Sequence, residues 1–475
     1  MWHLSVNFAA SLTILYESMN KIIVFIAVVV TAFSARAEGY QINTLSAKQG
    51  GMGHVGVAMK LGSESMFFNP AGLAFSNKTL DISGTLTGIK AIGTATVSGE
   101  KFKTCNGIST PISFNAAFKV YDNLQAGVSF YTPYGSSIDW SNDWPGAVLN
   151  QKVKLATYTI QPTLSWRILP KLSVGAALTM TWGSVDLYKG LVSAKTMDRV
   201  LSVLDATGAL ASMGIDPSYR FGNTTPASVN LNGTADMALG FHVGAMYDIS
   251  SRVTVGVDYR SKVMMKVGSG DAYVNYANDI ARGILEKDLQ MINSANFKAE
   301  MPCPYVLNLG ISYKPIDRLI IAADAQLTGW KTYKTLEIDF LNEKLSSFNQ
   351  HLIKNYSNAW CFHLGAEYAL TSRFDIRTGM MIDTTPIDKD YYNPETPGMT
   401  KIEPSAGFSF KPIPNFSINM SFMYVAGLGK KDAKCTYVDL LAAKMPALQL
   451  PAQATFAADY KVHAFVPSIG VSVEF

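Results

Sequence analysis

The sequence predicts an all-β protein, a transmembrane antiparallel β-barrel of about 14 strands with an N-terminal plug. The chain has 475 residues, of which 48% are hydrophobic and only 16% are charged, whereas soluble domains have roughly 25% charged residues. Its one long apolar run, residues 22–33, is shorter than the roughly 20 residues that a membrane-spanning helix needs. Segments with a period of two residues follow instead, and a closed barrel of such strands satisfies every backbone polar group in lipid.

Residues 1–37 are predicted to be an upstream extension and a signal peptide. A short basic start at Met19, the apolar run and a small-residue cleavage box that ends at Ala37 are typical of secretion signals. We expect translation to start at Met19 and cleavage to follow Ala37. A membrane anchor is the alternative, but no charged stop-transfer cluster follows the apolar run. Export and a barrel together predict the cell outer membrane of a Gram-negative bacterium.

Residues 78–475 are predicted to form the barrel. In one clear segment, Phe416, Ile418, Met420, Phe422 and Tyr424 alternate with small polar residues, as expected where one strand face meets lipid. Six short turns separate such segments, at residues 121–123, 169–171, 248–251, 314–317, 370–372 and 411–414. Six turns pair twelve strands, and a first strand near residues 79–90 and a last strand over residues 464–475 bring the number to about 14.

The last strand alternates in the same way and ends at the aromatic residue Phe475. A C-terminal aromatic on an alternating strand is a signal for the barrel assembly machinery, which we therefore expect as a partner. The scattered net charge of +4, without a basic stripe and interleaved aromatics, argues against nucleic acid. Outer-membrane lipids and lipopolysaccharide are the other expected partners, and we expect a monomer.

Residues 38–77 do not alternate and are predicted to fill the barrel, because a barrel of this size encloses a lumen too wide for wall side chains to fill. The glycines allow tight backbone turns, and a disordered periplasmic tail, the alternative, would be more polar. The residues that we expect to form this plug are Gly50, Gly51, Gly53, Phe67, Phe68, Asn69, Pro70, Ala71 and Gly72.

The chain resembles the FadL/OmpP1/TodX family, outer-membrane transporters of long-chain fatty acids and other hydrophobic compounds. The resemblance covers essentially everything after residue 38. It rests on Gly39-Tyr40-Gln41-Ile42, the glycine cluster, Phe68-Asn69-Pro70-Ala71-Gly72, Ser129 to Gly135, Asp143-Trp144-Pro145-Gly146, Ile160 to Trp166, Pro304 to Tyr313 and Trp330. The sequence departs from the family at Ala147, where relatives often have arginine, so contacts in that loop are not carried over.

The resemblance implies a hydrophobic external groove, an inner site gated by an N-terminal hatch, and lateral release through a kink in the third strand. For the lateral opening the candidates are Thr132, Pro133, Tyr134 and Gly135, because proline breaks a strand ladder; a plain bend is the alternative. For the groove, helical spacing in two outer loops suggests Met197, Val200, Leu201, Leu204, Leu285, Leu289 and Ile292. Packing of these helices on the barrel mouth is the equal alternative.

The expected cargo is a hydrophobic small molecule, most of all a long-chain fatty acid. Its carboxylate needs a cation, for which Arg167, Arg260 and Lys262 are candidates, although each also suits a wall position. A diffusion porin is the alternative function. A lipid-modifying enzyme is less favoured, because none of the six histidines lies near a nucleophile motif. We therefore expect no catalytic residue, no metal and no cofactor.

The four cysteines have no metal-ligand spacing. Cys105 is expected in the first outer loop and Cys435 in the last, and the first and last strands of a closed barrel are neighbours. A disulfide between the two is therefore possible in an oxidising compartment, with free thiols as the alternative. Cys303 and Cys361 are expected on strands, without a partner.

Overall fold

A computed structural model describes residues 39–445 and 449–475; the predicted signal peptide lies outside these residues. Within them, a continuous ring of antiparallel strands closes where β1 pairs with β22. The 14 strands of the ring, in order, are β1 (Leu80–Thr87), β4 (Ile112–Tyr121), β5 (Leu124–Tyr131), β7 (Lys152–Leu169), β8 (Leu172–Val192), β9 (Ala227–Asp248), β10 (Val253–Arg260), β13 (Val306–Ile316), β14 (Leu319–Thr328), β17 (Ala359–Ala369), β18 (Phe374–Asp383), β19 (Lys401–Ile413), β20 (Phe416–Gly427) and β22 (Gln453–Glu474).

The ring confirms the predicted barrel and its strand number. All six predicted turns connect neighbouring wall strands at one end of the barrel, the end at which the chain terminates. The longer connections gather at the other end. In an outer-membrane barrel, short turns face the periplasm and long loops face outward, so the two ends are called periplasmic and outer below.

The sheet continues above the ring toward the outer end. The residues of this part were predicted from the sequence to be loops. The additional strands are β2 (Lys90–Val97), β3 (Glu100–Lys103), β6 (Gly135–Asp139), β11 (Val263–Tyr276), β12 (Ala295–Cys303), β15 (Thr335–Phe340), β16 (Gln350–Ile353) and β21 (Lys430–Val438). The predicted start of the last strand at residue 464 was therefore wrong. β22 begins at Gln453 because β2 and β21 pair with its outer half, as β1 and β20 do with its inner half.

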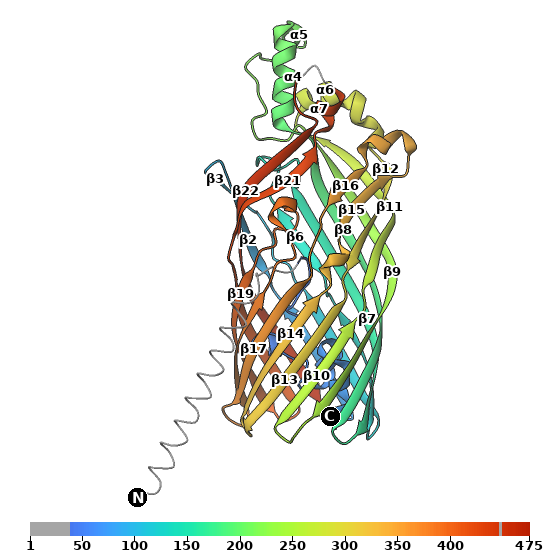
Figure 1. Ribbon diagram of the computed structural model, residues 1–475, viewed down its shortest axis with the longest axis vertical. Helices are drawn as coiled ribbons and strands as arrows, with labels where there is room; N and C mark the ends of the chain where they lie inside the picture. Colours follow the sequence, from blue (N-terminus) through green and yellow to red (C-terminus); the bar gives the residue numbers. More distant parts are fainter. Residues whose placement is uncertain (1–38, 446–448) are drawn as a thin grey trace, which may run out of the picture.

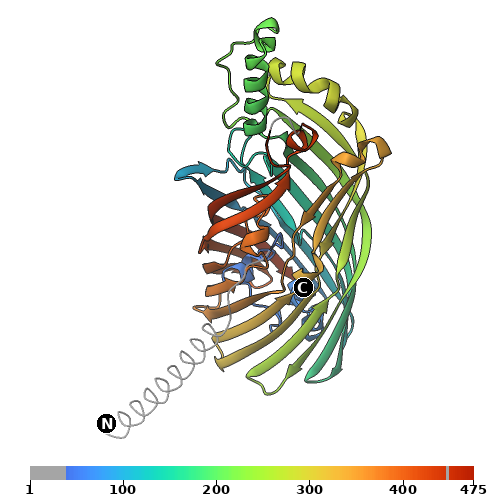
Figure 2. The same cartoon turned by 45° about the horizontal axis from the view of Figure 1, so that its top comes forward.

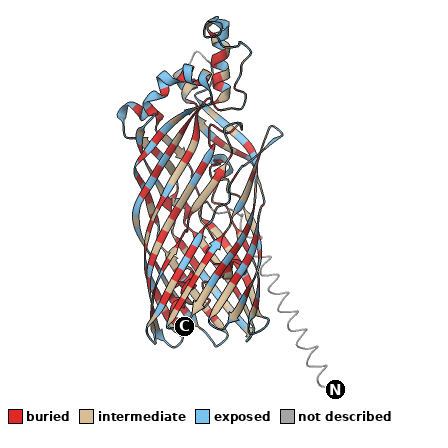
Figure 3. Ribbon diagram, turned by 180° about the vertical axis from the view of Figure 1, so that it is seen from behind, coloured by how far each residue is buried: buried red, intermediate tan, exposed pale blue. Residues whose placement is uncertain are grey.

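The wall has apolar residues outside and polar residues inside. On β20, Met420, Phe422 and Tyr424 are exposed, whereas Asn419 and Ser421 between them are buried. Figure 3 shows the same alternation of burial along the wall strands. An exposed apolar face and a buried polar face are the reverse of a soluble sandwich and are typical of strands that face lipid.

The N-terminal segment, residues 39–77, lies inside the ring toward its periplasmic end (Figures 1 and 2). It contains four short helical turns, α2 (Ala47–Gly50), η1 (Gly62–Glu64), α3 (Ser65–Phe68) and η2 (Pro70–Phe75). At least six wall strands contact it, including β7, β8 and β9 on one side and β19, β20 and β22 on the other. That the segment closes the lumen stays a prediction.

Short helices lie in the long connections, and α4 (Ala194–Ala206), α5 (Ala209–Ser212), α6 (Asp279–Leu289) and α7 (Leu440–Lys444) stand at the outer end of the barrel (Figure 1). The 3-10 turns of these connections are η3 (Gln290–Ile292), η4 (Trp330–Thr332), η5 (Glu343–Phe348) and η6 (Lys389–Tyr391). The side chain of Asp439, which caps α7, also accepts hydrogen bonds from Ser193 and Thr196 at the start of α4. The third and last long connections are thereby tied together. Among the described residues, no helix is long and apolar enough to cross a membrane.

Candidate functional site

The N-terminal segment rests on wall glycines, so its backbone approaches the backbone of the strands. A Cβ added at Gly256 or Gly365 would lie closer than 3.0 Å to the carbonyl group of Val57 or Met52, respectively. A glycine of the segment itself is also in close contact with the wall, since a Cβ at Gly51 would lie 2.8 Å from the Cα of Gly407. Glycine is required wherever two backbones approach this closely. The wall glycines that meet the backbone of the segment in this way are Gly175, Gly256, Gly365, Gly379 and Gly407, whereas Gly127, Gly244, Gly310 and Gly470 face side chains of the segment.

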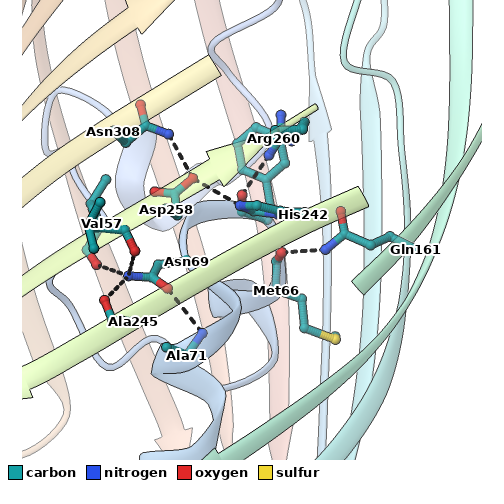
Figure 4. A network of polar contacts seen from close by, with 12 residues as sticks. Val57, Met66, Asn69, Ala71, Gln161, His242, Ala245, Asp258, Arg260 and Asn308 are labelled. Carbon is teal, nitrogen blue, oxygen red and sulfur yellow. Dashed lines mark hydrogen bonds and ion pairs between the residues drawn. The ribbon is translucent and has the colours of Figure 1, made fainter. Parts of the chain in front are cut away.

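Asn69 joins the segment to two wall strands (Figure 4). Its side chain is fully buried. Its Nδ2 donates to the carbonyl oxygens of Val57 at 2.9 Å and Ala245 at 3.1 Å, and its Oδ1 accepts from the backbone N–H of Ala71 at 3.0 Å. Because the last bond caps η2, one side chain both starts a helical turn and holds it against β9.

Charged wall side chains surround the same turn (Figure 4). Arg260 Nη2 donates to the carbonyl oxygen of Phe67 at 2.8 Å, and its guanidinium lies 4.6 Å from the centroid of the Phe67 ring. Beside it, His242 Nε2 lies 2.9 Å from Asp258 Oδ1, which also accepts from Asn308 at 2.9 Å. Arg260, one of the three predicted cations, therefore holds the segment in place.

Burial sets the charge of two groups in the segment. It lowers the pKa of His54 well below its usual value, with a further contribution from the neighbouring His363. Neutral His54 suits its contact, because its Nε2 lies 3.3 Å from the backbone N–H of Leu45, which donates to it. Burial likewise raises the pKa of Glu64, whose Oε2 accepts a hydrogen bond from Ser46 at 2.9 Å. Burial therefore shifts both groups towards the neutral form.

The third wall strand is interrupted at residues 132–134. β5 ends at Tyr131 and β6 begins at Gly135, although the N–H of Thr157 on β7 still donates to the carbonyl oxygen of Tyr134 at 3.0 Å. The N-terminal segment pairs with the other side of the interruption: the N–H of Ile42 donates to Pro133 at 2.9 Å and the N–H of Gly135 donates to Tyr40 at 2.9 Å. Among the described strands, β6 pairs only with β7.

Tyr40 links this break to the outer half of the barrel. Its ring packs edge-on against Trp330, with centroids 4.7 Å apart, and also contacts the rings of Tyr134 and Tyr333. Its hydroxyl donates to the carbonyl oxygen of Pro302. The first described residues of the segment are therefore fixed between the broken strand and the loop that follows β14.

A mostly apolar, partly open cavity is lined by Tyr40, and its residues surround about 860 Å³ of space, part of which is open solvent. Tyr40 of the segment and Ser136 of β6 both line it, so the cavity borders the segment and the strand break together. Its larger apolar lining residues are Val153, Leu155, Val185, Leu187, Leu231, Met265, Val267, Phe297, Met301, Leu336 and Ile338. A site of this kind suits an apolar ligand.

A second, wider cleft lies toward the outer end, where its residues surround about 1560 Å³ of space that includes open solvent. It shares Leu231 and Ile338 with the inner cavity, so the two adjoin. Lys189 lines the cleft with only 8% of its side chain exposed, and its Nζ donates to Gln350 Oε1 at 3.0 Å. The sequence reasoning missed Lys189. Lys189 is an even number of residues from Ser173 and Thr181 on β8, so all three side chains lie on the inward face of the strand. This spacing was the signal from which an inward lysine could have been predicted.

The remaining basic candidates lie elsewhere. Arg167 is near the periplasmic turn, where its Nη2 donates to the carbonyl oxygen of Asp122 at 3.2 Å. Lys262 is exposed between β10 and β11. A buried ion pair, Lys354 with Glu395, lies between the outer cleft and the inner cavity, and Glu395 lines the latter.

The predicted groove residues are helical and mostly buried. Met197, Val200 and Leu201 on α4, and Leu285, Leu289 and Ile292 on α6 and η3, belong to one hydrophobic cluster with the outer wall, and Leu204 packs against it. These helices therefore pack on the barrel mouth, which was one of the two arrangements that the sequence left open. The accessible cleft is instead bordered by η5, β16 and β21.

The possible Cys105–Cys435 disulfide is not formed, and the four cysteines are free thiols, which was the alternative. The cause is the position of β22. The β2–β3 hairpin, which precedes Cys105, pairs with one edge of β22, and β21, which carries Cys435, pairs with the other. Cys105 is exposed, whereas Cys435 is buried against Val148 and Leu149. Among the described residues, no group of three or more His, Cys, Asp or Glu side chains suits a metal ion.

Comparisons with known proteins agree with this architecture. A family model described as "Outer membrane protein transport protein (OMPP1/FadL/TodX)" matches residues 28–475. An outer membrane protein of Neisseria meningitidis serogroup B is 24% identical over 440 residues, covering 86% of this chain and 90% of that protein. The long-chain fatty acid transport protein of Escherichia coli O6:H1 is 20% identical over 418 residues, with coverage of 85% and 90%. The crystal structure of a Pseudomonas aeruginosa FadL homologue superposes with a TM-score of 0.74 at 18% identity, covering 92% of this chain and 100% of that one.

Proposed function

Because the chain belongs to the OMPP1/FadL/TodX family of outer membrane transport proteins, we propose that it carries long-chain fatty acids across the outer membrane of a Gram-negative bacterium. The observation that carries this proposal is the mostly apolar lining of the inner cavity, which joins Tyr40 of the N-terminal segment to Ser136 beside the strand break. An apolar chamber of this kind attracts a hydrophobic molecule that an aqueous pore does not.

The proposed path begins in the outer cleft, continues into the inner cavity and ends at the strand break. The N-terminal segment acts as a hatch, since it closes the lumen below the cavity and also pairs with residues 133–135. A shift of the hatch therefore changes the cavity and the break together. Release is lateral, through the wall at Thr132, Pro133, Tyr134 and Gly135, because the closely seated segment leaves the axial route obstructed.

Buried charge favours a cargo with an acidic head group. The charges of Glu395 and Lys354 both act on Lys189. Glu395 pairs with Lys354, whereas Lys189 donates a hydrogen bond to the neutral side-chain amide oxygen of Gln350. A fatty-acid carboxylate bound to Lys189 would balance the remaining charge, with its acyl chain directed over Leu231 into the inner cavity.

Replacing Lys189 by methionine is expected to weaken oleate binding by about 10- to 100-fold, since a charge-assisted hydrogen bond contributes about 1.5–3 kcal/mol. Binding of the neutral analogue oleyl alcohol should stay within about twofold. The measurement is titration of the purified barrel in mild detergent with both ligands. Lys154→Met, an exposed lysine on the adjacent strand, is the matched control. Equal losses for both ligands, or none, would contradict the role of Lys189.

Linking the second and third strands at the break should trap the cargo. Ile112 and Thr132 lie just beyond Ser113 and Tyr131, the last pair between β4 and β5. The N–H of Ile112 donates to Thr132 Oγ1 at 3.2 Å. In an Ile112→Cys/Thr132→Cys variant with Cys105→Ser, oxidation is expected to leave oleate affinity unchanged but to lower cellular oleate uptake about tenfold. Reduction should restore uptake. Unchanged uptake in the oxidised protein would contradict lateral release at this position.

Cellular uptake tests the proposed function as a whole. Cells that lack their own fatty-acid transporter should accumulate labelled oleate when they produce this chain, and should not gain permeability to small sugars. The opposite result would support a diffusion porin. We further propose that the chain works as a monomer and that β22, whose end is followed by the exposed aromatic Phe475, is recognised by the barrel assembly machinery.

A further inference from the structure

Three exposed lysines share one outward face at the outer end of the barrel. Lys101 and Lys103 lie on β3, and Lys461 lies on β22. Thr94 of β2 is opposite both Lys103 and Lys461 in the ladder. Residues directly opposite each other project to the same side, as do residues two apart on one strand. The three side chains, called the lysine face below, therefore project together.

The lysine face lies directly above the apolar wall. Lys461 and Phe465 are four residues apart on β22 and so point to the same side, about 13 Å apart along the strand. Phe465 is 41% exposed, and its ring lies 5.4 Å from that of Tyr424 on the neighbouring strand. Exposed aromatics of this kind mark the edge of the hydrocarbon layer. The lysine face is thus at the depth of lipid head groups.

The lysine face forms no close ion pair with the protein. Among the described residues, no carboxylate lies within 4.0 Å of its ammonium groups, whereas two lysines on other outer strands are paired across strands. Lys266 of β11 lies 3.0 Å from Glu300, and Lys298 of β12 lies 3.8 Å from Asp339. Asp459, opposite Thr96 and two residues before Lys461, projects to the same side, where it accepts a hydrogen bond from the N–H of Asp432; it leaves the three lysines with an excess of positive charge.

We propose that the lysine face binds the phosphate groups of lipopolysaccharide in the outer leaflet. Three unpaired ammonium groups complement a multiply charged phosphate head group. The face is directed sideways, continuous with exposed Phe465 and Tyr424, so a lipid can place its phosphates on the lysines and its acyl chains on the aromatics. A soluble polyanion would gain only the first of these contacts. Figure 1 shows β3 and β22 together at one side of the outer end.

The test compares lipid A that carries its phosphates with the dephosphorylated lipid, using the whole folded barrel in detergent. The wild type should bind the phosphorylated lipid about tenfold or more tightly, with an affinity that falls as salt rises. The variant Lys101→Gln/Lys103→Gln/Lys461→Gln should lose this difference. Lys266→Gln/Lys298→Gln, which removes two paired lysines, should keep it, and a shift in gel mobility on heating checks that each barrel is folded.

Three results would overturn the proposal. The first is equal affinity of the wild type for both lipids. The second is a triple variant that discriminates between the lipids as well as the wild type does. The third is binding of inorganic polyphosphate as tight as that of lipid A, which would identify a soluble polyanion as the ligand. None of these depends on whether the barrel transports fatty acids.

Discussion

Replacing Gly365 by alanine is expected to unseat the N-terminal segment and to turn a closed barrel into a conducting one. A Cβ at this position would lie closer than 3.0 Å to the carbonyl oxygen and carbonyl carbon of Met52. Because these are backbone atoms, no change of rotamer relieves the clash. Overpacking of this kind costs about 1–3 kcal/mol or more, and the cost falls on the segment rather than on the paired wall strands.

Single-channel recording in planar bilayers measures the effect, and protease digestion of residues 39–77 measures it independently. Gly365→Ala should show frequent open events and rapid cleavage, and the double variant Gly175→Ala/Gly365→Ala should show more of both. Gly84→Ala is the matched control, since a Cβ at this wall glycine would have its nearest neighbours at 3.7 and 3.9 Å. A closed, protease-resistant Gly365→Ala barrel would show that the contact between the segment and β17 tolerates the added methyl group.

The different behaviour expected of Gly365 and Gly84 marks a limit of the sequence reasoning. Both glycines lie in alternating strands, and nothing in the local pattern separates them. They differ only because residues 51–53 fold back onto β17, β18 and β19. That contact joins positions more than 300 apart in the chain, which periodicity within a strand does not report.

The barrel wall was predictable because the alternation of apolar and polar residues along a strand is a local pattern. Alternation along β20 and short turns identify strand faces and hairpins from a few neighbouring residues. The same rule identifies Lys189 as an inward lysine once the alternation of β8 is followed to its outer end. The rule reverses toward the outer end, where β22 continues to Gln453 and pairs with β21 and then β2. There Phe456, Ala458 and Tyr460 turn inward and the residues between them are exposed, so an apolar outward face no longer marks the strand.

The strand break was predictable in position but not in its contacts. Pro133 lacks an N–H, so a ladder interruption there follows from covalent structure alone. That its carbonyl oxygen accepts from Ile42, and that Tyr40 fills the space beside Trp330, depends on how the whole segment enters the lumen. The family resemblance of Gly39-Tyr40-Gln41-Ile42 marked the segment, and the geometry gives the reason for the glycine: a Cβ at Gly39 would lie 2.8 Å from the Trp330 ring.

A disulfide between the N-terminal segment and the wall should stop transport reversibly, if the segment moves during the transport cycle as proposed. A Cβ at Gly50 would lie 3.8 Å from the Cβ of Ser421 on β20, which matches the usual separation of disulfide-bonded cysteines, about 3.8 Å. The backbone of Gly50 is not left-handed, so cysteine is tolerated there. We expect Gly50→Cys/Ser421→Cys, with exposed Cys105 changed to serine, to lose at least about tenfold in oleate uptake when oxidised.

Reduction with dithiothreitol should restore uptake to the level of the two single-cysteine variants, which serve as controls for the substitutions themselves. Oleate binding in the outer cleft should survive oxidation, because Lys189 and Gln350 do not contact the linked residues. The disulfide and the Gly365 substitution act in opposite directions on the equilibrium between the bound and the displaced N-terminal segment. The Gly365→Ala barrel that also carries Gly50→Cys/Ser421→Cys should therefore be closed when oxidised and conducting when reduced. Full uptake by the oxidised staple would show that cargo passes while the segment stays seated, and the gate would then lie at the strand break alone.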